Sequence, residues 1–154
     1  MPSEKIQELL IPSAICLQLT AADSKQVLET LAGRLYQAGY VHESFADAAL
    51  QREAQMPTGL PLEGAYNAAI PHTDIQHVIK PALALATLQA PVNFQNMIEP
   101  ETAVPVQLVI LMALEQAKTQ VEMLQEIAGV LQDAEVIDKL MHARSTQQVF
   151  EAFS

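Results

Sequence analysis

The sequence predicts an α/β fold: a single-domain layered structure with a mixed β-sheet of about five strands and helices on both faces. Short apolar segments bounded by proline or glycine have the length of strands, and longer segments around them repeat apolar residues at helical intervals. Two predicted helices, at 23–40 and 43–56, follow each other without a strand between them, so we expect a mixed sheet. No internal repeat or linker divides the 154 residues, and we expect one domain over residues 1–154.

The first strand and the first helix are predicted within residues 13–40. Residues 13–19, SAICLQL, alternate well enough between apolar and polar side chains for a strand. A helix is predicted over 23–40, with Asp23 as its N-cap and Gly39 at its C-terminal end. Its apolar stripe consists of Val27, Leu28, Leu31 and Leu35.

A second helix, a loop and the remaining strands are predicted in the middle of the chain. The helix over 43–56 ends at Pro57, and residues 57–66, PTGLPLEGAY, contain two prolines and two glycines, which predicts a loop. Strands are expected at 67–70, 81–88 and 104–114, with a short candidate strand at 92–95.

The C-terminal part of the chain is predicted to be helical. Apolar residues recur there at i, i+3, i+7 and i+10, which is the pattern of an amphipathic helix. These residues are Val121, Leu124, Ala128 and Leu131. Two shorter helices are expected around 136–141 and 149–153.

Composition and charge restrict the class of protein. With 50% apolar and 17% charged residues the chain is expected to fold, and no apolar run approaches the roughly 20 residues of a membrane span. The net charge of −10 is spread evenly, without a basic stripe, which argues against nucleic-acid binding and favours partners with basic docking patches. The single cysteine, Cys16, and the lack of a signal peptide predict a cytoplasmic protein.

A histidine stands where a buried strand is predicted to end. In YNAAIPHTD, residues 66–74, the apolar run stops at Pro71, which cannot donate to a sheet ladder. His72 is then expected at the mouth of the strand, where α/β proteins usually bind their ligands.

Several kinds of chemistry remain open for His72. It is a nucleophile, a metal ligand together with Asp74 and His77, or a histidine held in a polar pocket without a chemical role. The spacing of the three residues is not a recognised zinc pattern. No GxSxG motif is present, and neither nucleotide-binding glycine motif occurs, so we expect no nucleotide cofactor.

The segment AAIPH, together with REAQMPTGL about twenty residues upstream, resembles the enzyme IIA component of the mannitol/fructose class of the sugar phosphotransferase system. In that family an arginine–glutamate pair closes a helix, a threonine-containing loop follows, and a small-apolar strand runs into Pro-His. The matching residues here are Arg52 and Glu53, Thr58, and 68–72. The resemblance covers roughly residues 5 to 153.

The resemblance implies a phosphoryl relay without bound metal or cofactor. A histidine phosphocarrier protein would donate a phosphoryl group to His72, which would pass it to a cysteine of enzyme IIB. A neutral imidazole is a competent nucleophile near pH 7. Arg52 would balance the phosphoryl charge, unless it is a solvated helix residue. Thr58 would either offer its hydroxyl to a phosphoryl oxygen or serve as an ordinary loop threonine.

One position departs from the family pattern. Many members carry a second histidine at the start of the helix after the last strand, and the matching residue here is Gln120. A glutamine can donate a hydrogen bond to a phosphoryl oxygen but cannot be protonated. The departure makes the galactitol-specific branch the closest in type.

The partners implied are therefore the phosphocarrier protein as donor and enzyme IIB as acceptor, with membrane contact only through the transporter complex. Leu60 and Leu62 in the 57–66 loop either form an apolar rim for these partners or pack beneath the loop. The alternative function is a regulatory enzyme IIA-like domain that binds other proteins according to its phosphorylation.

Overall fold

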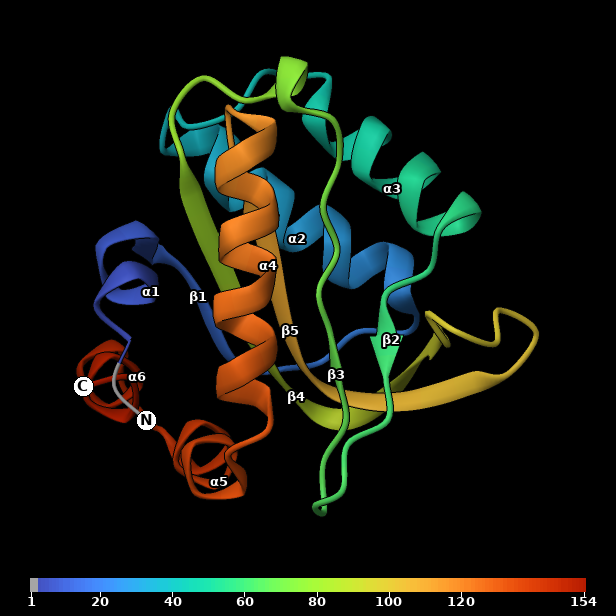
Figure 1. Cartoon of the computed structure of the whole chain (residues 1–154), viewed down its shortest axis with the longest axis vertical. Helices are drawn as coiled ribbons and strands as arrows, with labels where there is room; N and C mark the ends of the chain where they lie inside the picture. Colours follow the sequence, from blue (N-terminus) through green and yellow to red (C-terminus); the bar gives the residue numbers. More distant parts are fainter. Residues whose placement is uncertain (1–2) are drawn as a thin grey trace.

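A five-stranded sheet lies between two groups of helices in the computed structural model, which describes residues 3–154 (Figure 1). The strands are β1 Leu10–Leu19, β2 Gly59–Leu60, β3 Ala68–Ala69, β4 Ala82–Gln95 and β5 Ala103–Ala113. The α-helices are α1 Glu4–Leu9, α2 Ser24–Gln37, α3 Phe45–Gln55, α4 Ala117–Leu131, α5 Ala134–His142 and α6 Thr146–Ala152. A short 3-10 helix, η1, spans Ile75–His77.

The strand order is β1-β4-β5-β3-β2, and the sheet is mixed, as predicted. β1 pairs with β4 in parallel, and β3 pairs with β5 in parallel. The long β4–β5 pair and the short β2–β3 pair are antiparallel. Because β3 and β5 run in parallel, their carboxyl ends lie at the same end of the sheet. The candidate site lies at this end.

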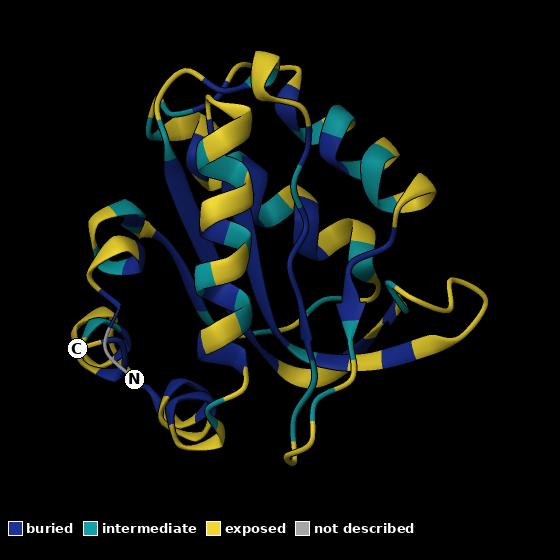
Figure 2. Cartoon of the chain, in the orientation of Figure 1, coloured by how far each residue is buried: buried dark blue, intermediate teal, exposed yellow. Residues whose placement is uncertain are grey.

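Alternation along the central strands divides the core into two layers. Leu83 and Leu85 of β4 pack in the cluster formed with α1, α4, α5 and α6, whereas Ala84 and Ala86 pack in the cluster with α2 and α3. The small alanine side chains allow α2 to lie close to the sheet. In Figure 2 the central strands are buried over 82–88 of β4 and 108–113 of β5, whereas their far ends and the outward sides of α3 and α4 include exposed residues.

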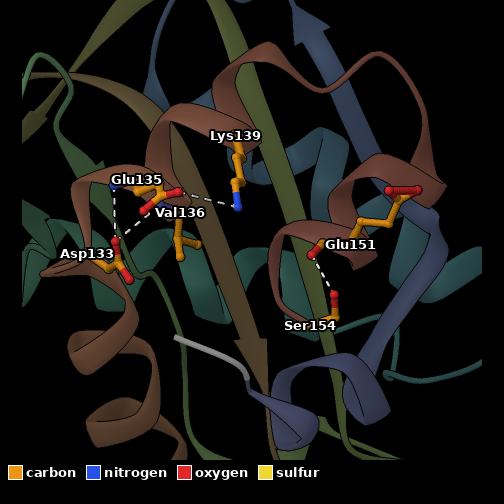
Figure 3. A network of polar contacts seen from close by, with 6 residues as sticks. All are labelled: Asp133, Glu135, Val136, Lys139, Glu151 and Ser154. Carbon is orange, nitrogen blue, oxygen red and sulfur yellow. Dashed lines mark hydrogen bonds and ion pairs between the residues drawn. The ribbon is translucent and has the colours of Figure 1, made fainter.

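Helix α5 shows how local polar contacts fix the C-terminal elements. Asp133 is its N-cap, and Oδ1 of Asp133 accepts hydrogen bonds from the backbone N–H groups of Glu135 (3.1 Å) and Val136 (3.3 Å), as Figure 3 shows. One turn further, Nζ of Lys139 lies 3.8 Å from Oε1 of Glu135. This exposed i,i+4 pair adds about 0.2–0.5 kcal/mol to the helix. Asp133 lies two residues after the end of α4, so its capping hydrogen bonds fix where the chain turns from α4 into α5.

The predicted helices and main strands are confirmed, and the differences include α1, β2, η1 and the 92–95 strand. The helix α1 was not predicted, because six residues with only Ile6 buried give no readable periodicity. The predicted loop at 57–66 contains β2, whose two residues become a strand only by pairing with β3. The candidate strand at 92–95 is not separate, because β4 is continuous through it.

Proline does not end β4. Pro91 lies where the pairing with β5 slips between Thr87 and Val92, so it interrupts no regular ladder there. At the start of the second helix, Asp23 is the N-cap as predicted, and its Oδ1 accepts a hydrogen bond from the backbone N–H of Gln26 at 3.0 Å. Within residues 3–154, no helix combines the length and the apolar content needed to cross a membrane.

Candidate functional site

His72 lies immediately beyond the paired part of β3. Ala69 is paired with Val109 of β5, and the carbonyl of Pro71 still accepts a hydrogen bond from the N–H of Met112 at 3.0 Å. The chain therefore follows β5 as far as Pro71 and leaves the sheet at the half-buried His72. This is the strand-end position that the sequence predicts.

The imidazole of His72 is anchored through one nitrogen. Its Nδ1 lies 3.1 Å from the backbone carbonyl oxygen of Ile70. A carbonyl can only accept, so Nδ1 carries the hydrogen and donates it. In the neutral ring the lone pair is then on Nε2, which leaves Nε2 as the nucleophilic nitrogen.

Burial lowers the pKa of His72 below its ordinary value of 6.5, and the nearby positive charge of Arg52 acts in the same direction. The hydrogen bond to Ile70 and the negative charge of Asp74 oppose the shift. Because the net direction is downward, the ring is mainly neutral at pH 7. A neutral ring with a fixed tautomer keeps a lone pair available for attack.

Arg52 approaches the histidine from the last turn of α3. Its Nη1 lies 3.4 Å from Oδ1 of Asp74, two residues after His72. Its Nε is buried and has no hydrogen-bond partner among the residues that the structure describes. With the side chain 30% exposed, the guanidinium keeps N–H groups that a further acceptor can use.

Glu53 and Thr58 close the turn between α3 and β2. The carboxylate of Glu53 accepts hydrogen bonds from the Thr58 hydroxyl (2.7 Å) and from the Thr58 backbone N–H (2.9 Å). Burial raises the pKa of Glu53 from 4.5 to about 7, although both hydrogen bonds oppose the rise. Thr58 itself is only 2% exposed, and its hydroxyl proton is directed at Glu53.

The same turn is joined to the histidine through the backbone. The carbonyl of Thr58 accepts a hydrogen bond from the N–H of Ile70 at 3.4 Å, and the carbonyl of Ile70 accepts from His72. Next to Thr58, a Cβ on Gly59 would lie 2.6 Å from the carbonyl oxygen of Gln95, so only glycine fits. Three hydrogen bonds therefore lead from the Glu53 carboxylate to the His72 ring.

Gln120 lies in the first turn of α4, the helix that follows β5 in the chain. It is half-buried and shares a helix face with Leu124 and Ile127, which pack in the core. Among residues 3–154, its side-chain amide has no hydrogen-bond partner. The structure thus brings Arg52 and Thr58 into the surroundings of His72 but does not bond Gln120 to them.

The residues considered for a metal site do not form one. In the described part of the chain, no three histidine, cysteine, aspartate or glutamate side chains are grouped so that they could hold a metal ion. Nδ1 of His77 is instead 2.8 Å from the hydroxyl oxygen of Ser44, and Asp74 contacts Arg52.

Two contacts of the site are not evident from the sequence. The sequence identifies Glu53 only as a motif residue and Asp74 only as a candidate metal ligand. Their proximity to Arg52 and His72 in the sequence was the available signal. What each carboxylate contacts depends on the turn at 56–58 and on the path of the chain after Pro71.

The sequence matches the model of the family described as "Phosphoenolpyruvate-dependent sugar phosphotransferase system, EIIA 2" over residues 8–154. The chain belongs to this family. As an enzyme IIA it has the general role of a phosphoryl carrier, a transferase function. The predicted family is thereby confirmed.

Relatives of this enzyme IIA include sugar-specific and regulatory proteins. The galactitol-specific EIIA component of Escherichia coli K12 is 30% identical over 129 residues, 84% of this chain and 85% of the relative. A nitrogen regulatory protein of Bradyrhizobium diazoefficiens is 30% identical over 152 residues, 97% of this chain and 94% of the relative.

A solved structure confirms the fold of this enzyme IIA. In the complex of enzyme IIAMTL with phosphorylated enzyme IIBMTL from Escherichia coli, the similar chain is 25% identical and has a TM-score of 0.75. The similarity covers 94% of this chain and 98% of that chain. The five-stranded mixed sheet with its helices is therefore the enzyme IIA fold.

Proposed function

We propose that His72 accepts a phosphoryl group from the histidine phosphocarrier protein and passes it to a cysteine of enzyme IIB. The transfer would serve the uptake and phosphorylation of a hexitol, galactitol or a related sugar. The enzyme IIA unit would span residues 1–154 and act in the cytoplasm, reaching the membrane only through the transporter complex. It would require neither cofactor nor metal.

The observation that carries this proposal is the anchoring of His72. With Nδ1 donating to Ile70, the Nε2 lone pair is free to attack phosphorus. An Nε2–P bond forms as the N–P bond of the phosphocarrier breaks, and the donor imidazole leaves neutral. In the second step an enzyme IIB thiolate attacks, an S–P bond forms, and the Nε2–P bond breaks. Each step moves one phosphoryl group and needs no further reactant.

Three side chains are candidates for stabilising the transferred group. Arg52 has unused N–H groups beside His72 and would bind the phosphoryl oxygens. Thr58 would donate its hydroxyl only after releasing Glu53, because the proton is engaged there. Gln120 would donate its free amide in place of the family's second histidine.

The acceptor and the sugar class rest on the relatives. The solved complex of enzyme IIAMTL contains phosphorylated enzyme IIBMTL, which supports an enzyme IIB as the acceptor here. The galactitol-specific relative supports a hexitol as the sugar class.

A regulatory role is the second candidate function, because the nitrogen regulatory relative matches 97% of this chain. In that case His72 would be phosphorylated, but enzyme IIB would not accept the group. Protein binding would instead depend on the phosphorylation of His72.

A reconstituted relay tests both functions. We expect phosphoenolpyruvate, enzyme I and the phosphocarrier to add one phosphoryl group, labile in acid and stable in base, as seen by intact mass. A galactitol-type enzyme IIB should then remove it. His72→Gln should abolish labelling, while His142→Gln, an exposed control on α5, should not. Labelling that no enzyme IIB discharges would favour the regulatory function.

A further inference from the structure

The side chain of Asp74 does not cap the helix that follows it. It stands at the N-cap of η1, where an aspartate usually accepts from backbone N–H groups, yet its side chain makes no capping hydrogen bond. The carboxylate instead contacts Arg52, with Oδ1 3.4 Å from Nη1. Asp74 therefore interacts with the proposed phosphoryl-binding residue and lies two positions from the nucleophile.

The contact between Asp74 and Arg52 is weak enough to exchange. At 3.4 Å it is long for a charge-assisted hydrogen bond, and the side chains are 63% and 30% exposed. Water therefore screens the pair strongly. Arg52 also keeps its buried Nε without a partner among residues 3–154, so the contact leaves the guanidinium incompletely bonded.

Both charges act on His72, in opposite directions. Arg52 disfavours a positive ring and Asp74 favours one, which places both groups within electrostatic reach of the nucleophile. A phosphoryl group on Nε2 would bring about −1.5 to −2 charges to the same place. It would attract Arg52 and repel Asp74, whose exposed side chain is free to turn toward solvent.

We propose that Asp74 is a positioning residue that competes with the phosphoryl group for Arg52 and thereby raises the energy of phospho-His72. The inference rests on the proposed function and deepens it. A carrier that held the phosphoryl group too tightly would not pass it on. By keeping part of the Arg52 charge and repelling the phosphoryl oxygens, Asp74 keeps the group transferable.

The test compares Asp74→Asn with Asp47→Asn, which removes the same charge from an exposed residue in the first turn of α3. We measure the equilibrium of phosphoryl exchange between each purified protein and the phosphocarrier. Asp74→Asn should shift it toward phospho-His72 by roughly two- to fivefold, and Asp47→Asn should not. In an Arg52→Gln background the effect of Asp74→Asn should shrink, since the competition is then absent.

A second readout needs no phosphorylation. NMR titration of the His72 ring should give a lower pKa in Asp74→Asn than in the wild type, because the favourable negative charge is removed. Equal exchange equilibria for Asp74→Asn and Asp47→Asn, with wild type phosphorylated, would overturn this inference alone. A wild-type protein that is never phosphorylated would instead overturn the proposed function, and the inference with it.

Discussion

The carboxylate of Glu53 accepts two hydrogen bonds from one residue, Thr58, through its hydroxyl at 2.7 Å and its backbone N–H at 2.9 Å. The ring that they close fixes the chain between α3 and β2. The carbonyl of Thr58 then holds Ile70, and Ile70 holds the His72 ring. The buried Glu53 carboxylate, which takes no part in the reaction itself, is thus connected to His72 through a chain of hydrogen bonds.

The first prediction concerns the pH dependence of stability. Burial raises the pKa of Glu53 in the folded protein to about 7, from 4.5. Between these values the unfolded chain has lost the proton and the folded chain keeps it. The Glu53 contribution to the free energy of unfolding is therefore full below pH 4.5 and falls as the pH rises to 7, by at most about 3 kcal/mol.

The measurement compares denaturant unfolding of wild type and Glu53→Gln from pH 4.5 to pH 8. Glutamine does not titrate, so the stability of wild type relative to the variant should decrease with increasing pH. The comparison cancels the titration of His72. A difference that stays constant with pH would show that the Glu53 carboxylate is solvated.

The second prediction concerns the Thr58 hydroxyl. Thr58→Val keeps the shape of the side chain but leaves the buried Glu53 carboxylate without one donor, so stability should fall by about 1–3 kcal/mol. The rate of single-turnover transfer to His72 should stay within roughly threefold of the wild-type rate, because the variant only slightly disturbs the position of the turn beside His72. A stable variant that transfers more than about tenfold slower would show that the hydroxyl leaves Glu53 to bind the phosphoryl group.

The third prediction concerns Arg52. Arg52→Gln should slow phosphoryl transfer to His72 by roughly one to three orders of magnitude, because a charge-assisted hydrogen bond to the phosphoryl oxygens is lost. Arg52→Lys should recover only part of the rate, since a point charge does not reproduce the planar fork. Thermal melts of both variants provide the control for folding. If a folded Arg52→Gln protein transferred at the wild-type rate, Arg52 would be a solvated helix residue without a role in transfer.

The fourth prediction concerns Gln120. Its amide makes no hydrogen bond in the described, unphosphorylated chain, so Gln120→Ala should change stability by less than about 0.5 kcal/mol. If the amide binds a phosphoryl oxygen, the lifetime of phospho-His72 should shorten by about fivefold, the effect of one neutral hydrogen bond. Hydrolysis of the isolated phosphoprotein measures this lifetime, and an unchanged value would remove Gln120 from the site.

Much of this arrangement was predictable from periodicity and motif. The segment from Ala68 to His72 contains small apolar residues, a proline and a histidine, and this order predicts a buried strand that ends at a reactive side chain. The helix cap at Asp23 was equally readable, because the cap contacts residues within one turn. Local patterns of this kind do not depend on the rest of the fold.

The missed features depend on distant partners. β2 exists only because Gly59 and Leu60 pair with β3, whereas the proline and glycine content of its local sequence predicts a loop. Leu60 and Leu62 are half-buried and pack against the core, as the packing alternative predicts, while their contact with partners stays a prediction. Side chains that the structure leaves exposed near the site elements are Met56, Ile75 and Val121.

The phosphorylated atom is the central claim, and NMR of the phosphorylated protein tests it most directly. With ¹⁵N-labelled histidine, the ring nitrogens of His72 show which one carries the phosphoryl group. The anchoring of Nδ1 at Ile70 predicts phosphorus coupled to Nε2, with Nδ1 still protonated. A phosphoryl group on Nδ1, or on any residue in a folded His72→Gln variant, would contradict the account.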